Sequence, residues 1–165
     1  MTPREGFLER LDAVERRLAV LASSPARPGA LTEPDPASNE RWDPGQVWAH
    51  LAEFVAYWTQ QLRMVIAAYR EEPVPFGRTK TDEQRLAAIE RDRTIAVAVL
   101  WTQTLSDIES LRSFLETLGS DSWQARGLHP TLGVMPLERI VDDFLVGHLE
   151  EHAAQLELLV AVSDV

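Results

Sequence analysis

Three of the chain's four histidines have a spacing that suits metal binding. His148 and His152 lie four residues apart in a strongly helical segment near the C-terminal end, so both imidazoles project from one helix face, one turn apart. His50 lies far upstream, in another strongly helical segment. An imidazole from a facing helix would complete a set of three nitrogens around a divalent metal and leave a coordination position open, as catalytic sites do.

The histidine pair also falls on the apolar stripe of its helix, which runs through Leu145, His148, His152, Leu156 and Leu159. His50 lies beside the apolar stripe of its own helix. Burying a polar group without a partner costs roughly 1–3 kcal/mol, and a shared metal would satisfy all three rings. Imidazole suits zinc, nickel, copper or iron. The alternative is three separate core or rim histidines, each hydrogen-bonded to a carbonyl or carboxylate, since spacing alone does not show that His50 reaches the pair.

The segments that must position these histidines have the periodicity of amphipathic helices, with apolar residues at steps of three and four. Asp43-Pro44 marks a helix start, because an acidic N-cap precedes a proline at the first helical position. The four predicted helical regions cover residues 4–22, 44–70, 81–118 and 136–161. The third is long for one globular helix, and we expect it to bend.

The connections between these helices are long and rich in proline and glycine. Residues 23–43 are predicted to run over the surface, 71–79 to break the second helix, and 119–135 to be irregular. Four amphipathic helices with almost no strand signal predict an all-α fold, a four-helix bundle with long crossover connections. We expect one domain over residues 1–165.

Composition narrows the functional classes. The chain has 26 acidic and 16 basic residues and a net charge of −10, which argues against nucleic acid and anionic membranes as partners. It has no cysteine, so disulfides, thiolate zinc sites and a cysteine nucleophile are excluded, and any thiol must belong to a small molecule. The longest apolar run, Ile95 to Trp101, is too short to cross a bilayer. The N-terminus has no apolar signal-peptide core, so a cytoplasmic protein is expected.

Two stretches, "WDPGQVWAHLAEF" and "GLHPTLGVMPLERIVDDFLVGHLEEHAAQLE", resemble the DinB/YfiT-like superfamily of four-helix-bundle metalloproteins. Members carry one histidine early in helix 2 and His-x-x-x-His in the last helix, often followed by a glutamine. Here His50 matches the first histidine, His148 and His152 match the pair, and Gln155 matches the glutamine. The likeness covers nearly the whole chain. It implies a three-histidine open site for a divalent cation, nickel or zinc, with water in the open positions.

The resemblance also implies an activity. Characterised members are thiol S-transferases or thiol-dependent isomerases, such as maleylpyruvate isomerase, that use low-molecular-weight thiols. A metal-dependent transferase that activates a small thiol toward an electrophile is therefore expected. In the isomerase branch the last-helix motif is Glu-x-x-x-His, and His148 departs from it, which weakens the specific isomerase interpretation. The alternatives are a metal-assisted hydrolase or isomerase on the same site, or a non-enzymatic bundle with structural histidines that binds a partner. A homodimer is a further expectation from the resemblance.

The second nitrogen of each ligating imidazole needs a partner that fixes its tautomer. Glu53, Asp143, Glu151 and Gln155 are near enough in sequence to serve, although a solvated helix face is the alternative for each acid. We expect His129, in a Gly/Pro-rich loop, to be exposed and not to be a ligand.

Other side chains are candidates for a substrate pocket. Trp42 and Trp123 lie in or beside connections and could line one. Arg85, Arg91 and Arg93 could bind the carboxylates of an anionic thiol, but pairing with nearby acids is the favoured interpretation.

Overall fold

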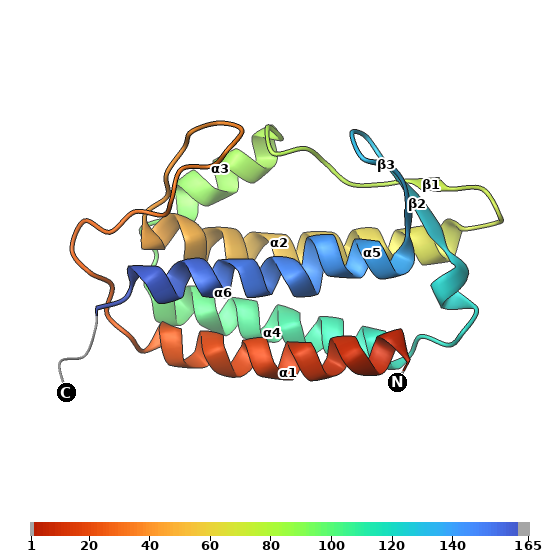
Figure 1. Cartoon of the computed structure of the whole chain (residues 1–165), viewed down its shortest axis with the longest axis horizontal. Helices are drawn as coiled ribbons and strands as arrows, with labels where there is room; N and C mark the ends of the chain where they lie inside the picture. Colours follow the sequence, from red (N-terminus) through yellow and green to blue (C-terminus); the bar gives the residue numbers. More distant parts are fainter. Residues whose placement is uncertain (1, 162–165) are drawn as a thin grey trace.

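The computed structural model describes residues 2–161, and four long helical segments form its bundle (Figure 1). The segments are α1 (Pro3–Ala22), α2 (Pro44–Ala68), α4 (Val97–Glu116), and a last one made of α5 (Leu137–Val141), the π-helical turn η2 (Asp142–Val146) and α6 (Gly147–Leu159). Helix α1 packs against α4 and α6, and α2 packs against the same two helices. The predicted bundle with long crossover connections is confirmed, and its topology makes α2 and α6 neighbours.

Local capping explains where the first two helices begin. Thr2 accepts a hydrogen bond from the Glu5 amide, and the Glu5 carboxylate accepts one from the Thr2 amide, which forms a capping box. Asp43 and Gln46 form the same arrangement at α2, with Pro44 at the first helical position. The predicted start of α2 is therefore confirmed.

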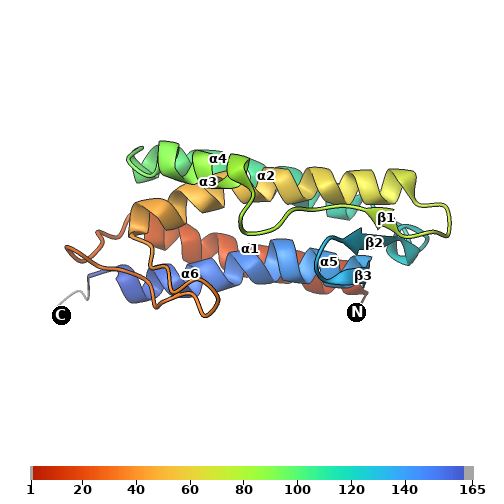
Figure 2. The ribbon, with the colours of Figure 1, turned by 90° about the horizontal axis from the view of Figure 1, so that it is seen from above.

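The third helical region is divided rather than bent. Helix α3 (Glu83–Asp92) ends before a corner, and α4 begins at Val97. The first turn of α2 lies against this corner, because a Cβ at Gly45 would fall 2.1 Å from the Arg93 carbonyl oxygen. Helix α3 packs on α2. In Figure 1 both α3 and the connection between α1 and α2 lie above the bundle, and Figure 2 shows α3 on the side of α2 and the connection on the side of α6.

A small sheet forms between two of the connections, and the expectation that residues 119–135 are irregular was wrong. Strand β1 (Val74–Pro75) pairs in parallel with β2 (Arg126–His129), and β2 pairs antiparallel with β3 (Gly133–Pro136). A short 3-10 turn, η1 (Ser122–Gln124), precedes β2. These strands are too short, and too rich in glycine and proline, to show an alternating pattern in the sequence. Their pairing joins segments that are distant along the chain.

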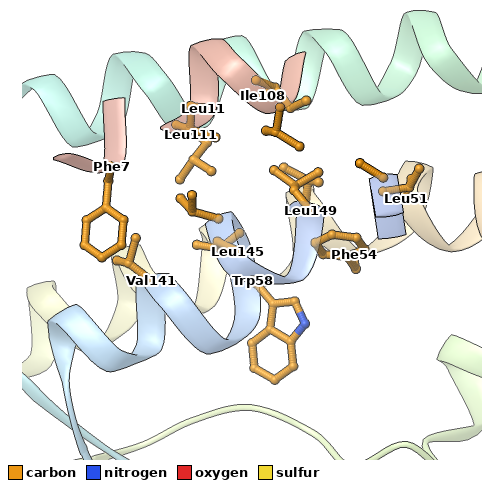
Figure 3. Close-up of a cluster of buried hydrophobic side chains, with 14 of the residues drawn as sticks. Phe7, Leu11, Leu51, Phe54, Trp58, Ile108, Leu111, Val141, Leu145 and Leu149 are labelled. Carbon is orange, nitrogen blue, oxygen red and sulfur yellow. The ribbon is translucent and has the colours of Figure 1, made fainter. Parts of the chain in front are cut away.

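The core runs the length of the bundle and contains buried apolar side chains from every long helix. Figure 3 shows part of this core, including Leu11, Leu51, Ile108, Leu111 and Leu149. All five are fully buried. Within the described residues, no helix is both long and apolar enough to cross a membrane.

Candidate metal centre

The structure brings the three predicted histidines together where α2 faces α6. The Nε2 atom of His148 lies 3.1 Å from Nε2 of His50 and 3.1 Å from Nε2 of His152. One ligand atom from each ring fits within a span of 4.8 Å. His50 and His152 are buried, whereas the side chain of His148 is 26% exposed. The cluster is therefore closed by protein on two sides and reaches solvent beside His148.

In the last helix, the Nδ1 atom of each histidine is hydrogen-bonded to the side chain three residues further along the chain. His148 Nδ1 lies 3.2 Å from Glu151 Oε2, and His152 Nδ1 lies 2.7 Å from Gln155 Oε1. Both partners are oxygen acceptors, so each Nδ1 donates its proton. Asp143, another candidate for this role, pairs with Arg139 instead.

His50 has the most enclosed support. Its Nδ1 donates to Glu53 Oε1 at 2.8 Å. Arg78 Nη2 donates to both oxygens of the same carboxylate, at 2.7 and 2.6 Å, and its guanidinium lies 3.9 Å from the Tyr57 ring centroid. Burial raises the pKa of Glu53, and the positive charge of Arg78 opposes that rise. Arg78 lies in a Pro/Gly-rich linker without helical periodicity, so no sequence signal linked it to the site.

The hydrogen bonds at Nδ1 determine what kind of group the three Nε2 atoms can bind. With the three ring protons on Nδ1, the three Nε2 lone pairs face one another, and no N–H is left to join them. Burial lowers the pKa of His50 and of His152 well below the usual value, and the positive charge of the neighbouring histidines lowers it further. Three imidazole nitrogens whose lone pairs converge in this way are the donor set of a bound cation.

Two of the three distances between the Nε2 atoms also fit such a cation. Metal–nitrogen bonds of about 2.0–2.1 Å in a tetrahedral site put the ligand nitrogens about 3.3 Å apart. The two Nε2 separations of 3.1 Å are close to that value. The residues present therefore suit a divalent metal with one or more open positions.

Aromatic rings surround the cluster. Trp42 packs edge-on against His50, with ring centroids 5.3 Å apart, and lies parallel to His152 at 6.3 Å. Phe54 contacts His50 and His148 at centroid distances of 4.9 and 4.6 Å. These rings exclude water and strengthen electrostatic interactions within the cluster. Trp123, the other tryptophan singled out in the sequence, stacks on Phe7 instead.

The arginines of the α3 region differ in whether they form an ion pair with a carboxylate. Arg93 pairs with Glu90, as the pairing interpretation predicts, and also with Asp43, which is distant along the chain, while Arg91 pairs with its neighbour Asp92. Arg85 has no carboxylate within 4.0 Å among the residues that the structure describes.

His129 is buried, so the expectation of an exposed loop histidine was wrong. It lies on the inward face of β2 and stacks on Phe144 with ring centroids 5.1 Å apart. Its Nε2 donates to the Arg78 carbonyl at 3.2 Å, and its Nδ1 accepts from the Thr131 and Leu132 amides at 3.3 Å. It does not join the histidine cluster.

A cavity of about 720 Å³ lies further along α2, beyond the Arg78–Glu53 pair. Tyr57 and Gln61 of α2, Phe76 and His129 form part of its lining. The histidine cluster is not part of this lining.

No protein-family model matches the chain, and no curated protein matches it. Solved structures match over nearly its whole length. YfiT from Bacillus subtilis, described as a probable metal-dependent hydrolase with an unusual four-helix bundle topology, matches with a TM-score of 0.68 and 19% identity. The match covers 94% of this chain and 85% of that chain.

A mycothiol-dependent maleylpyruvate isomerase matches with a TM-score of 0.70 and 15% identity. The match covers 94% of this chain and 61% of the isomerase chain, so the present chain spans about three fifths of the isomerase. An uncharacterized protein from Clostridium difficile 630 matches with a TM-score of 0.63 and 8% identity, over 93% of both chains. These likenesses show that the chain has the YfiT-like fold.

Proposed function

We propose that this chain is a metal-dependent transferase for a small thiol, with His50, His148 and His152 holding one divalent cation. The observation that carries the proposal is the convergence of three Nε2 lone pairs whose rings donate their only protons outward. A cation bound there would lower the pKa of a coordinated thiol and stabilise the thiolate as a nucleophile at neutral pH. The mycothiol dependence of the structurally similar isomerase supports thiol chemistry.

The donor set also favours particular ions. Three neutral imidazoles without a thiolate or carboxylate ligand suit nickel or zinc, which we propose as the resident metal. Glu53 and Gln155 would fix the tautomers of His50 and His152, and so aim both Nε2 lone pairs at the ion.

A thiol can act as the nucleophile at this site without a general base from the protein. The nearby carboxylates of Glu53 and Glu151 already accept hydrogen bonds from histidine Nδ1 atoms. A thiol that loses its proton to solvent on binding needs no such base. Its sulfur then bonds to the electrophilic carbon, and the leaving group departs with its electron pair. The chain itself has no cysteine, so the sulfur comes from a small molecule.

Hydrolysis at the same site is the second candidate, and the description of YfiT as a probable metal-dependent hydrolase favours it. The two reactions separate in a simple assay. A hydrolase turns over its substrate without added thiol, whereas the transferase requires one.

The first experiment is elemental analysis of protein purified without a histidine tag, beside a His148→Ala/His152→Ala double variant. We expect near-stoichiometric nickel, zinc or another divalent metal in the wild type and none in the double variant. His129→Gln is the matched control, because His129 is buried but lies outside the cluster. Wild-type protein that stays empty after incubation with these ions would refute the metal site.

The non-enzymatic alternative predicts a different result for one variant. If His50 supports the metal and the reaction, His50→Ala should remove metal and activity while the apoprotein stays folded. If the histidines are purely structural, the same change should lower the free energy of unfolding instead. Urea denaturation of the metal-free proteins separates the two outcomes.

A further inference from the structure

Arg85 differs from the other arginines near the metal centre. Arg78, Arg91 and Arg93 each lie within ion-pair distance of a carboxylate. Arg85 is half-buried, and no carboxylate of residues 2–161 lies within that distance. Its Nη1 donates to the Lys80 carbonyl at 2.8 Å. Burial lowers the pKa of Arg85, and the positive charge of Arg78 adds to this, while the negative charges of Glu53, Glu40 and Asp82 oppose it.

Trp42 contacts both the Arg85 guanidinium and the histidine cluster. The guanidinium is 5.5 Å from the Trp42 ring centroid, and Trp42 contacts both His50 and His152. The contact with Trp42 also orients the planar guanidinium. A ligand bound at the histidines would need to extend only past this indole to meet Arg85.

The charges around the cluster leave a place for an anion. Glu53 is the most buried carboxylate beside the histidines, and it is already paired with Arg78. Lys80, next to the Arg85 contact, pairs with Asp35. A divalent cation on three neutral histidines would add two further positive charges next to Arg85. A partly desolvated guanidinium in such a field binds a carboxylate through charge-assisted hydrogen bonds.

We propose that Arg85 is a specificity-determining residue that binds a carboxylate of the thiol. This proposal rests on the proposed function, because it places the sulfur of the same molecule at the metal. The ligand class is thus a small thiol with a carboxylate, long enough for its sulfur to lie at the histidines while its carboxylate reaches Arg85 past Trp42. A sulfur ligand held at one point can rotate freely, and the second contact fixes its direction.

The test uses cobalt(II)-substituted protein, because thiolate binding to cobalt gives a charge-transfer absorption that can be titrated. The probes are ω-mercapto acids of increasing chain length, each compared with the ω-mercapto alcohol of equal length. Hydrogen bonds to a charged group contribute about 1.5–3 kcal/mol. We therefore expect the acid to bind wild-type protein about 10- to 100-fold more tightly than the alcohol at the length that reaches Arg85.

Arg85→Met should abolish this preference without weakening the binding of the alcohols. Arg85→Lys keeps the charge without the planar fork and should retain part of the preference. Arg91→Met is the matched control on the same helix, since Arg91 is exposed and pairs with Asp92, and it should behave like the wild type. Circular dichroism checks that each variant is folded.

The outcomes separate the two proposals. Equal binding of acids and alcohols at every length, or an unchanged preference in Arg85→Met, would overturn the role of Arg85 and leave the thiol chemistry standing. Cobalt-loaded protein that shows no thiolate absorption with either series would overturn the proposed function, and the role of Arg85 with it.

Discussion

Replacing Glu53 with glutamine tests the physical reasoning behind the metal centre most directly. The amide has the shape of the carboxylate, but it has one acceptor oxygen and no charge. In the native site the two oxygens accept from His50 Nδ1 and from Arg78 Nη2, and both Glu53 and Arg78 side chains are about nine-tenths buried. In the variant, the amide NH2 must face one of these donors. The tautomer of His50 is then no longer fixed.

The expected magnitude follows from the geometry. Removing the group that orients a ligating histidine costs about 10- to 100-fold in metal affinity, or about 1.4–2.7 kcal/mol. Arg78 also loses its buried counter-charge, and its Nε already has no hydrogen-bond partner among the described residues. The metal-free variant should therefore be less stable by about 3 kcal/mol.

Glu151→Gln is the matched control. Glu151 makes the same i,i+3 contact, with His148, but its distance is 3.2 Å and its side chain is 74% exposed. Exposed pairs contribute at most about 1 kcal/mol, so its effect on metal affinity should stay below about fivefold.

The assay is competition for zinc against a chromophoric chelator at pH 7.5, with urea denaturation of the metal-free proteins. Equal losses of affinity in Glu53→Gln and Glu151→Gln would show that burial does not determine the strength of this support. Wild-type affinity in Glu53→Gln would refute the role of Glu53 altogether.

Three further predictions concern stability, each measured by urea denaturation of the metal-free protein. Because burial holds the pKa of His50 and His152 below that of the unfolded chain, stability should fall as the pH drops below about 6.5, at up to about 1.4 kcal/mol per pH unit for each ring. A His50→Gln/His152→Gln variant should show a flatter profile, and an unchanged slope would contradict this cause. Gly147→Ala should cost about 1–3 kcal/mol, because its Cβ would fall 2.7 Å from the Asp142 carbonyl oxygen, whereas Gly119→Ala meets no described atom within 4 Å and should be nearly neutral. Leu111→Ala, at a fully buried core position, should cost about 2–5 kcal/mol, and a loss under 1 kcal/mol would mean that the site is less well packed than the structure shows.

The features that depend on neighbours along the chain were predictable from the sequence. Asp43-Pro44 starts α2 because capping uses only adjacent residues. His148 and His152 share a face because helix geometry puts residues four apart together. The same local rule supplies the supporting groups, since Glu53, Glu151 and Gln155 each follow a histidine by three residues. That repeated spacing is a stronger sequence signal than each residue taken singly.

The features that join distant segments were decided by the tertiary structure alone. His50 meets the histidine pair because the crossover connections make α2 a neighbour of α6, and helical periodicity does not specify which helices are neighbours. Arg78 reaches the site from a linker, and Arg85 contacts Trp42 from α3, which packs on α2. His129 is buried because β2 pairs with two other short strands. Periodicity reports the faces of one element at a time, whereas each of these contacts exists only once separate elements have packed together.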